Sequence, residues 1–368
     1  MIPNLKGLKI CFIAGTLGMG GAEKQLYYIL RSLVAQGANV SLISLSTGEH
    51  WEQPIKDLGV HYYFLKGKTS KPARIWAIRG LLNKLKPEIV QSQHFYTNLY
   101  AATGAWFCGA KSVGASRSEL KVEIRLNGRF GMPSFRWPQY FVLNSMLSVS
   151  QAIELGKLKS HVFYLPNALD TEKFSQDIQY SSIEKKQLTI LTIGRMTIEK
   201  RFDLFIELIS NLHAKYGDRI KGQLIGDGKL SVELKELAAK RGLGERELEF
   251  VQKTDRPEDY LKQADFFVLT SEFEGTPNVV LEAMACGLPV VTTKVGNLQY
   301  FIKDGENAVF SDNETEELSE KMVALIEDKD RCIRLSSNAV KTVNEWFSIE
   351  QLGKNLSGIY LQIRSKKQ

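Results

Sequence analysis

Two carboxylates, Glu274 and Glu282, flank a Gly-Thr-Pro turn in the segment EGTPNVVLEAMACGLP. Carboxylates accept hydrogen bonds from hydroxyl groups such as those of a sugar or a ribose. Thr276 suits an N-cap and Pro277 a first helical residue, so a helix is expected to start there, with Glu282 in its second turn. Its dipole and its first amides favour an anion. Those amides belong to Asn278, Val279 and Val280.

A ligand with both hydroxyls and an anionic group would use these features together, and a sugar nucleotide has both. The alternative is a plain turn residue at Glu274 and a solvated helix residue at Glu282.

Two cations follow another expected strand, in the segment IGRMTIEKR. Arg195 and Lys200 then lie on a loop at the carboxyl end of that strand, where ligands of parallel sheets bind. There they can neutralise a diphosphate leaving group as its charge develops. An interdomain salt bridge is the alternative role.

Further candidates also follow expected strands. Gly20 and Gly21, in TLGMGGAEKQ, let a backbone approach a ligand closely, but the segment is not a complete G-x-G-x-x-G fingerprint. His94 follows a strand in IVQSQHFY, where a lone histidine is more often structural. Gly226 and Asp227, in IGDGKL, border a ligand or form an ordinary turn.

The elements that position these residues alternate between strand and helix in both halves of the chain. Strands are expected at 9–15, 39–45, 60–65, 87–93, 146–150, 161–167, 188–194 and 220–226, with helices at 22–37 and 73–85 among them. Such alternation predicts parallel sheets covered by helices on both faces. We therefore expect an α/β protein with two tandem Rossmann-like doubly wound domains that face each other across a cleft.

The polar stretch 168–187 lacks an apolar period and is the expected linker. The domains are then 1–167 and 188–345. The segment 346–368 is expected to form an amphipathic helix.

The motifs together resemble the retaining glycosyltransferases of family four, which have the GT-B fold. Glu274, seven residues, Glu282 and then AMACGLP match the family signature. The resemblance implies that Glu274 contacts the donor sugar, Glu282 the ribose, and Arg195 and Lys200 the diphosphate. It implies a sugar contact for His94, an acceptor-binding domain at 1–167, a nucleotide-sugar-binding domain at 188–345, and a last helix, 346–368, that crosses back to the first domain. The chain departs from the family pattern at Arg201 and at Ala168 of LPNALD, where glycine is usual, which weakens the case for a left-handed residue at the Ala168 hinge.

Charge is distributed unevenly along the chain. Residues 1–170 hold 20 Lys and Arg against 9 Asp and Glu, which leaves 28 against 32 for the remainder. An excess of +11 charges in the first half favours an anionic membrane surface, a phosphorylated acceptor or nucleic acid as partner. The alternative is that these are ordinary solvated lysines with no partner role. This half contains a segment, 117–141, that mixes aromatic and basic residues. It is either a surface that binds the acceptor or the membrane, or a helix whose aromatic residues face the core. The candidate residues of that surface are Arg117, Arg125, Arg129, Arg136 and Trp137.

The composition of the chain indicates its compartment and whether it needs a cofactor. There is no apolar run of about 18 residues and no recognisable signal segment, so we expect a cytoplasmic protein, peripheral on the inner face of the membrane if it binds lipid. The five histidines include no paired spacing and the DKD at 328–330 reads as solvated surface, so neither a metal nor a cofactor is expected.

The expected function is retaining, metal-independent transfer of a sugar, from a UDP-sugar in preference to a GDP-sugar, to a saccharide or lipid-linked saccharide. Bacterial surface polysaccharide assembly is the expected setting. The alternatives are another GT-B enzyme, such as a sugar-nucleotide epimerase or a phosphorylase, and a non-catalytic basic partner of membranes or nucleic acid. Nucleic acid is not an expected partner of the enzyme.

Overall fold

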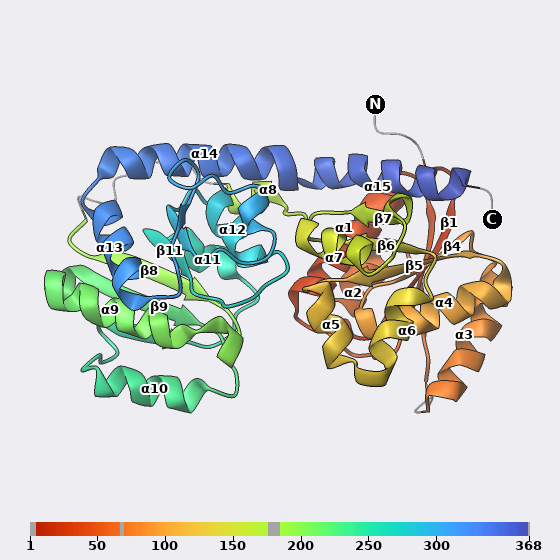
Figure 1. The fold of residues 1–368 in the computed structure, drawn as a ribbon, viewed down its shortest axis with the longest axis horizontal. Helices are drawn as coiled ribbons and strands as arrows, with labels where there is room; N and C mark the ends of the chain where they lie inside the picture. Colours follow the sequence, from red (N-terminus) through yellow and green to blue (C-terminus); the bar gives the residue numbers. More distant parts are fainter. Residues whose placement is uncertain (1–4, 67–69, 176–184, 367–368) are drawn as a thin grey trace. The chain divides into compact units, whose positions relative to one another are not determined.

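The computed structural model describes residues 5–66, 70–175 and 185–366. The chain divides into two units, Met1–Ala168 with Ile349–Gln368, and Leu169–Ser348. Each unit is a parallel sheet with helices packed against it, as the alternation of strands and helices predicts (Figure 1). Within the described residues no helix is long and apolar enough to cross a membrane.

The first unit holds a seven-stranded sheet in the order β3-β2-β1-β4-β5-β6-β7. Its strands are β1 (Lys9–Ala14), β2 (Asn39–Ser44), β3 (His61–Phe64), β4 (Ile89–Ser92), β5 (Lys111–Ser116), β6 (Tyr140–Leu143) and β7 (Val162–Tyr164). Its helices are α1 (Gly21–Ala35), α2 (Glu52–Asp57), α3 (Lys71–Leu85), α4 (Asn98–Cys108), α5 (Leu120–Leu126), α6 (Gly131–Arg136), α7 (Met146–Glu154) and α15 (Ile349–Ser365). The central strand β4 is buried at every residue, and β1 and β5 are buried at all but their first, as expected for strands covered by helices on both faces.

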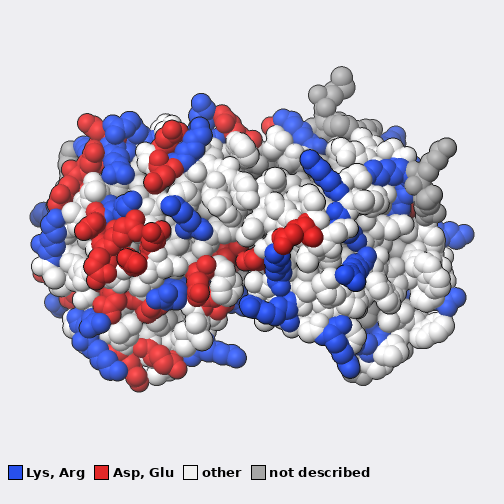
Figure 2. All heavy atoms as spheres, in the orientation of Figure 1, with Lys and Arg blue, Asp and Glu red and all other residues white. Residues whose placement is uncertain are grey.

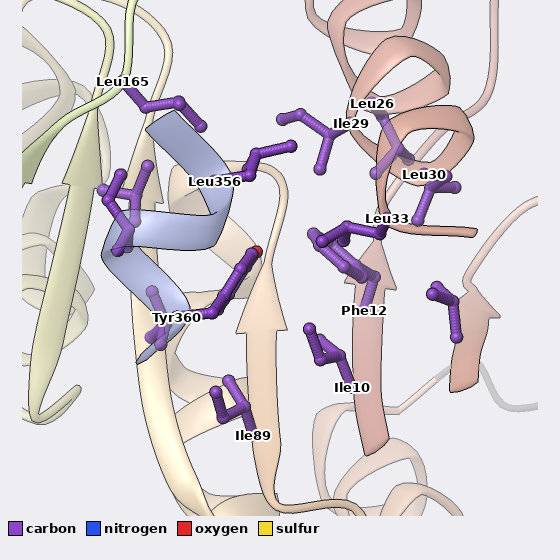
Figure 3. Packing of buried hydrophobic residues seen from close by; sticks show 14 of the residues in the cluster. Ile10, Phe12, Leu26, Ile29, Leu30, Leu33, Ile89, Leu165, Leu356 and Tyr360 are labelled. Carbon is purple, nitrogen blue, oxygen red and sulfur yellow. The ribbon is translucent and has the colours of Figure 1, made fainter. Parts of the chain in front are cut away.

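Helix α15 is part of the core of the first unit although it ends the chain. Leu356 and Tyr360 point from it toward the side chains of α1 and β1 (Figure 3), and both are about 1% exposed. The Tyr360 hydroxyl donates to Gln91 Oε1 of β4 at 2.7 Å. Burying one such side chain contributes about 1.5–3 kcal/mol, so this helix stabilises the unit substantially.

The second unit holds a six-stranded sheet in the order β10-β9-β8-β11-β12-β13. Its strands are β8 (Leu188–Ile193), β9 (Ile220–Ile225), β10 (Leu248–Val251), β11 (Phe266–Leu269), β12 (Val290–Thr292) and β13 (Val309–Phe310). Its helices are α8 (Thr171–Phe174), α9 (Phe202–Tyr216), α10 (Ser231–Lys240), α11 (Pro257–Leu261), α12 (Asn278–Ala285), α13 (Thr315–Ile326) and α14 (Lys329–Phe347).

Two boundaries differ from the sequence prediction. The second unit begins at Leu169, not at 188, because Leu169 and Phe174 are buried in its core. A helix of four residues is too short to show an apolar period, which is why 168–187 reads as a linker. Residues 176–184 of that linker lie outside the described residues. The C-terminal helix of the first unit begins at Ile349 and not at 346.

The segment 146–150, expected as a strand, belongs to helix α7. The Ser145 side chain accepts a hydrogen bond from Ser148 N at 3.1 Å, which caps the helix. The strand of this region is instead β6, which begins six residues earlier and whose residues are all buried. A short apolar run does not distinguish strand from helix by periodicity alone.

Candidate functional site

At the carboxyl end of the second sheet, Lys200 Nζ and Glu274 Oε1 form a direct ion pair. The two side chains are only 14% and 18% exposed, and Ser271 Oγ donates to the same carboxylate oxygen at 3.1 Å. A charge-assisted hydrogen bond is stronger than one between neutral groups. Two residues expected to be catalytic therefore meet, although 74 positions separate them.

Hydrogen bonds to the backbone fix the turn that carries Lys200, η5 (Ile198–Lys200). The carbonyl of Lys200 accepts from Thr270 Oγ1 at 2.8 Å, and Glu272 N donates to Glu199 O at 2.8 Å. The turn after β8 is thus tied to the loop after the neighbouring strand β11. Its position is set by two strands, so little reorganisation is needed to hold the ammonium in place.

Gly296 and Asn297 support the loop that carries Glu274. Asn297 N donates to Gly275 O at 2.7 Å. Gly296 has φ 53°, and a Cβ built on it would lie 2.0 Å from Gly275 O. Only glycine permits this left-handed close approach, so Gly296 supports the loop without touching the ion pair.

Helix α12 begins at Asn278, with Pro277 as the N-cap, so the expected cap at Thr276 is corrected by one residue. Pro277 is extended, with ψ 109°, and therefore precedes the first helical turn. Val280 N donates to Pro277 O at 3.2 Å, so the expectation of a ligand-facing Val280 amide is wrong. Asn278 and Val279, partly exposed, remain at the start of the helix, and Glu282 is buried within it at 4% exposure.

Arg195 and Asp227 lie on neighbouring loops after β8 and β9, and both side chains are exposed. Met196 N donates to Asp227 O at 2.7 Å, which joins the loops through their backbones. A Cβ on Gly226 would lie 1.9 Å from Gly194 O. Close packing thus explains Gly226 by itself, while the exposed Arg195 is available to a ligand.

Arg201 adopts the left-handed conformation, with φ 49° and ψ 44°. This is the position where the family usually has glycine, and the backbone there has the conformation that glycine adopts most easily. Its guanidinium pairs with Asp203, with Nη2 to Oδ2 at 2.9 Å, on a partly exposed surface. An arginine is held here at some conformational cost.

In the first unit, His94 bridges two loops at the carboxyl end of the sheet. Its Nδ1 accepts from Gly15 N at 3.2 Å and its Nε2 lies 3.1 Å from Glu23 Oε1. Because Nδ1 accepts, Nε2 carries the proton and donates to the carboxylate. Burial alone would raise the pKa of Glu23, but the hydrogen bonds from His94 and Thr16 outweigh it and lower that pKa.

Sequence reasoning missed Glu23 and Tyr96. Glu23 lies in the first turn of α1, whose N-cap is Gly20 and whose first residue is Gly21, and a Cβ on Gly20 would lie 2.2 Å from Glu23 Oε2. The Tyr96 ring stacks on His94 with centroids 5.3 Å apart. An acid in the turn after a glycine pair was an available signal for Glu23; nothing local marks Tyr96.

Arg117 lies at the carboxyl end of β5 and not with the exposed arginines, which corrects its expected place on an outer surface. Its Nη2 donates to Gln93 Oε1 at 3.3 Å, and Gln93 Nε2 donates in turn to Ala22 O at 2.6 Å. Burial lowers the pKa of the Arg117 guanidinium to about 10. Arg117 therefore belongs to the same sheet edge as Gln93 and His94.

The other aromatic and basic residues of this segment divide between surface and core. Arg125, Arg129, Arg136 and Trp137 are exposed, with Trp137 at 60%. Phe135 and Phe141 are instead buried in a core cluster, as the alternative reading proposed for the aromatics. Figure 2 shows basic and uncharged side chains over most of this unit's visible face, whereas acidic ones are frequent on the second unit.

Two family models match consecutive parts of the chain. Residues 19–173 match Glycosyltransferase Family 4, and residues 173–342 match Glycosyl transferases group 1. Together they span residues 19–342, which leaves out β1 and α15 of the first unit.

Curated relatives match at modest identity. A lipopolysaccharide core biosynthesis glycosyltransferase of Rhizobium meliloti, LpsE, is 30% identical over 48% of this chain and 50% of its own length. The chain spans between a third and three fifths of the length of the first curated relatives it matches. A Campylobacter jejuni N-acetylgalactosaminyltransferase named for a diNAcBac-PP-undecaprenol-linked saccharide is 24% identical over 90% of this chain and 92% of its own.

Among solved structures, Anabaena Alr3699/HepE in complex with UDP and glucose has a TM-score of 0.83 at 17% identity. The alignment covers 96% of this chain and 99% of that one. At this identity the likeness establishes the fold.

Proposed function

Because the chain belongs to the group 1, family 4 glycosyltransferases and has their two-domain α/β GT-B fold, we propose that it transfers a sugar from a nucleotide-sugar to a saccharide or lipid-linked saccharide. The transfer retains the anomeric configuration and needs no metal. UDP-sugars are the favoured donors, and bacterial surface polysaccharide assembly is the proposed setting. HepE, whose structure was solved with UDP and glucose, and LpsE are consistent with these choices.

The observation that carries the proposal is the ion pair of Lys200 with Glu274 at the carboxyl end of the second sheet. A donor diphosphate offers Lys200 a second anion, which frees Glu274 to accept hydroxyls of the donor sugar. Arg195 adds a cation on the adjoining loop. As the glycosidic bond breaks, negative charge grows on the leaving phosphate, and these cations stabilise that charge.

The acceptor hydroxyl must lose a proton during the transfer. In the proposed front-face route, the leaving phosphate oxygen takes this proton while the acceptor oxygen bonds to the same face of the anomeric carbon. In the first unit, the Nε2 proton of His94 is aimed at Glu23. We assign His94 to positioning the donor sugar, with Glu23 and Gly15 fixing the orientation of its ring.

Metal independence is proposed from the chemistry of the donor-side groups, which are cations where a metal would otherwise neutralise the diphosphate. Among the described residues, His213, Asp218 and Glu247 form a group whose ligand atoms lie within 4.8 Å of one another. These residues precede β9 and β10 in the chain. They therefore lie at the amino ends of the strands, the edge opposite Lys200.

A membrane-associated acceptor is supported by the surface of the first unit. Residues 61–136 hold 13 Lys and Arg against three Glu. On helices α3 and α4, Trp76 and Trp106 are 64% and 78% exposed, and the Arg79 guanidinium lies over Trp76 and Phe107 at 4.9 and 4.6 Å. Exposed tryptophans beside cations suit an anionic lipid interface. We call these four residues the tryptophan patch.

The test is a transfer assay on the full chain with radiolabelled UDP-, GDP- and ADP-sugars and a bacterial lipid extract, with and without EDTA. We expect one donor class to label a product whose anomeric configuration, read by NMR, matches the donor, and no effect of EDTA. Glu274→Gln should abolish labelling, whereas Lys303→Met, a 75% exposed lysine of the same unit, should not change it.

The two alternatives give different results in the same assay. An epimerase would release an altered free sugar or sugar nucleotide without any acceptor. A non-catalytic partner would label nothing and would show no stabilisation by nucleotides in a thermal-shift panel. Inversion of configuration would overturn the retaining mechanism while leaving glycosyl transfer intact.

A further inference from the structure

The Arg117 guanidinium is a buried cation with no anionic partner among the described residues. Its Nε is fully buried and makes no hydrogen bond, and its Nη2 reaches the neutral amide of Gln93 at 3.3 Å. At neutral pH it stays charged, since burial lowers its pKa only to about 10. An uncompensated buried charge destabilises a folded protein, so its presence calls for a reason outside the unliganded fold.

The groups around Arg117 do not supply the missing anion. Of the carboxylates at this sheet edge, Glu23 is bonded to Thr16 and His94, Glu49 accepts from Leu17 N, and Glu119 accepts from Gln151 Nε2 at 2.7 Å. The phenol of Tyr360 is kept neutral, because burial raises its pKa far above the usual range. Gln93 gives its amide hydrogens to Ala22 O and presents only its oxygen to Arg117.

The position of Arg117 suits a substrate. It follows β5 directly, and Gln93 and His94 follow β4, the neighbouring strand, so all three lie at the ligand-binding edge of a parallel sheet. The residue as a whole is partly exposed, so part of the side chain is reachable from solvent. Its planar fork of donors matches the paired oxygens of a phosphate or a carboxylate.

We propose that Arg117 binds an oxyanion of the acceptor, a phosphate or diphosphate of its carrier or the carboxylate of an acidic sugar. This inference rests on the proposed function, because it assigns the donor diphosphate to Lys200 and Arg195 in the second unit. Arg117 then selects acceptors that carry a negative group near the hydroxyl that reacts.

The experiment is a thermal-shift titration of the full chain with three probes: inorganic pyrophosphate, glucuronate and UDP. The variants are Arg117→Met, Arg117→Gln and, as a matched control in the same unit, Arg31→Met, at an exposed position of α1. Without ligand, Arg117→Met should melt about 2 °C or more above wild type, since a buried unpaired charge is removed. Affinity for the effective anion should fall roughly tenfold to a hundredfold, and the UDP shift should persist.

Each result has a distinct meaning. A response to pyrophosphate identifies a carrier phosphate, and one to glucuronate identifies an acidic sugar. The proposal is overturned if both Arg117 variants melt below wild type, if neither anion distinguishes them from wild type, or if Arg31→Met gives the same loss. Loss of the UDP shift in Arg117→Met would reassign Arg117 to the donor, whereas a wild type that ignores UDP would instead count against the proposed function.

Discussion

Replacing Lys200 by methionine tests both the donor site and the reasoning behind it. Methionine keeps most of the stem length of lysine. Among the described residues, the 18% exposed Glu274 carboxylate then keeps only the 3.1 Å bond from Ser271 Oγ. Hydrogen bonds to charged groups contribute about 1.5–3 kcal/mol, and the low exposure of both partners limits solvent screening. We expect Lys200→Met to lower the free energy of unfolding by about 2 kcal/mol.

A double-mutant cycle separates this pair from its surroundings. Once Lys200 is absent, Glu274→Gln removes an unpaired charge, so the double variant should be more stable than the sum of the single losses predicts, by about 1–2 kcal/mol. Urea unfolding of the four proteins followed by circular dichroism measures this coupling. Turnover of Lys200→Met should fall roughly a hundredfold or more, because a stabiliser of developing charge is lost. Additive stabilities together with near-normal turnover would refute the assignment.

Three further outcomes are expected. The free energy of unfolding of Arg201→Gly, measured with urea, should exceed that of Arg201→Ala by about 1 kcal/mol, because glycine tolerates the left-handed backbone and both variants lose the pair with Asp203. Equal stabilities would contradict this. Glu23 has a folded pKa below its usual 4.5, so its stabilisation is present above that pH and disappears as the pH falls below it. The stability gap between wild type and Glu23→Gln, measured by urea unfolding, should therefore shrink as the pH falls below about 4.5, and a constant gap would disprove the coupling. The double variant Trp76→Ala, Trp106→Ala should co-sediment less with anionic liposomes. The control Trp346→Ala, at a tryptophan of the second unit that is 49% exposed, should co-sediment as wild type does. An equal loss in the double variant and the control would argue against the tryptophan patch.

Local sequence was sufficient where one segment carries the whole signal. Strands such as β1 and β8 are short runs of mostly apolar residues, and turn residues end them, so the alternation of strand and helix follows from the sequence. The spacing of Glu274 and Glu282 likewise identified the donor segment. The short helix α8 was not predictable, because four residues show no period and Phe174 is buried only by the rest of the second unit.

The sequence by itself determined the fold class, the donor-side acids and cations, and the charge of the first half. Only the tertiary structure decided which of them meet, because parallel strands bring together loops that are far apart in the chain. The tertiary structure pairs Lys200 with Glu274 and Glu23 with His94. It places Arg117 at the end of β5, away from the exposed arginines. Whether an arginine is solvated or buried without a partner depends on its neighbours in space, and no local pattern of residues encodes that.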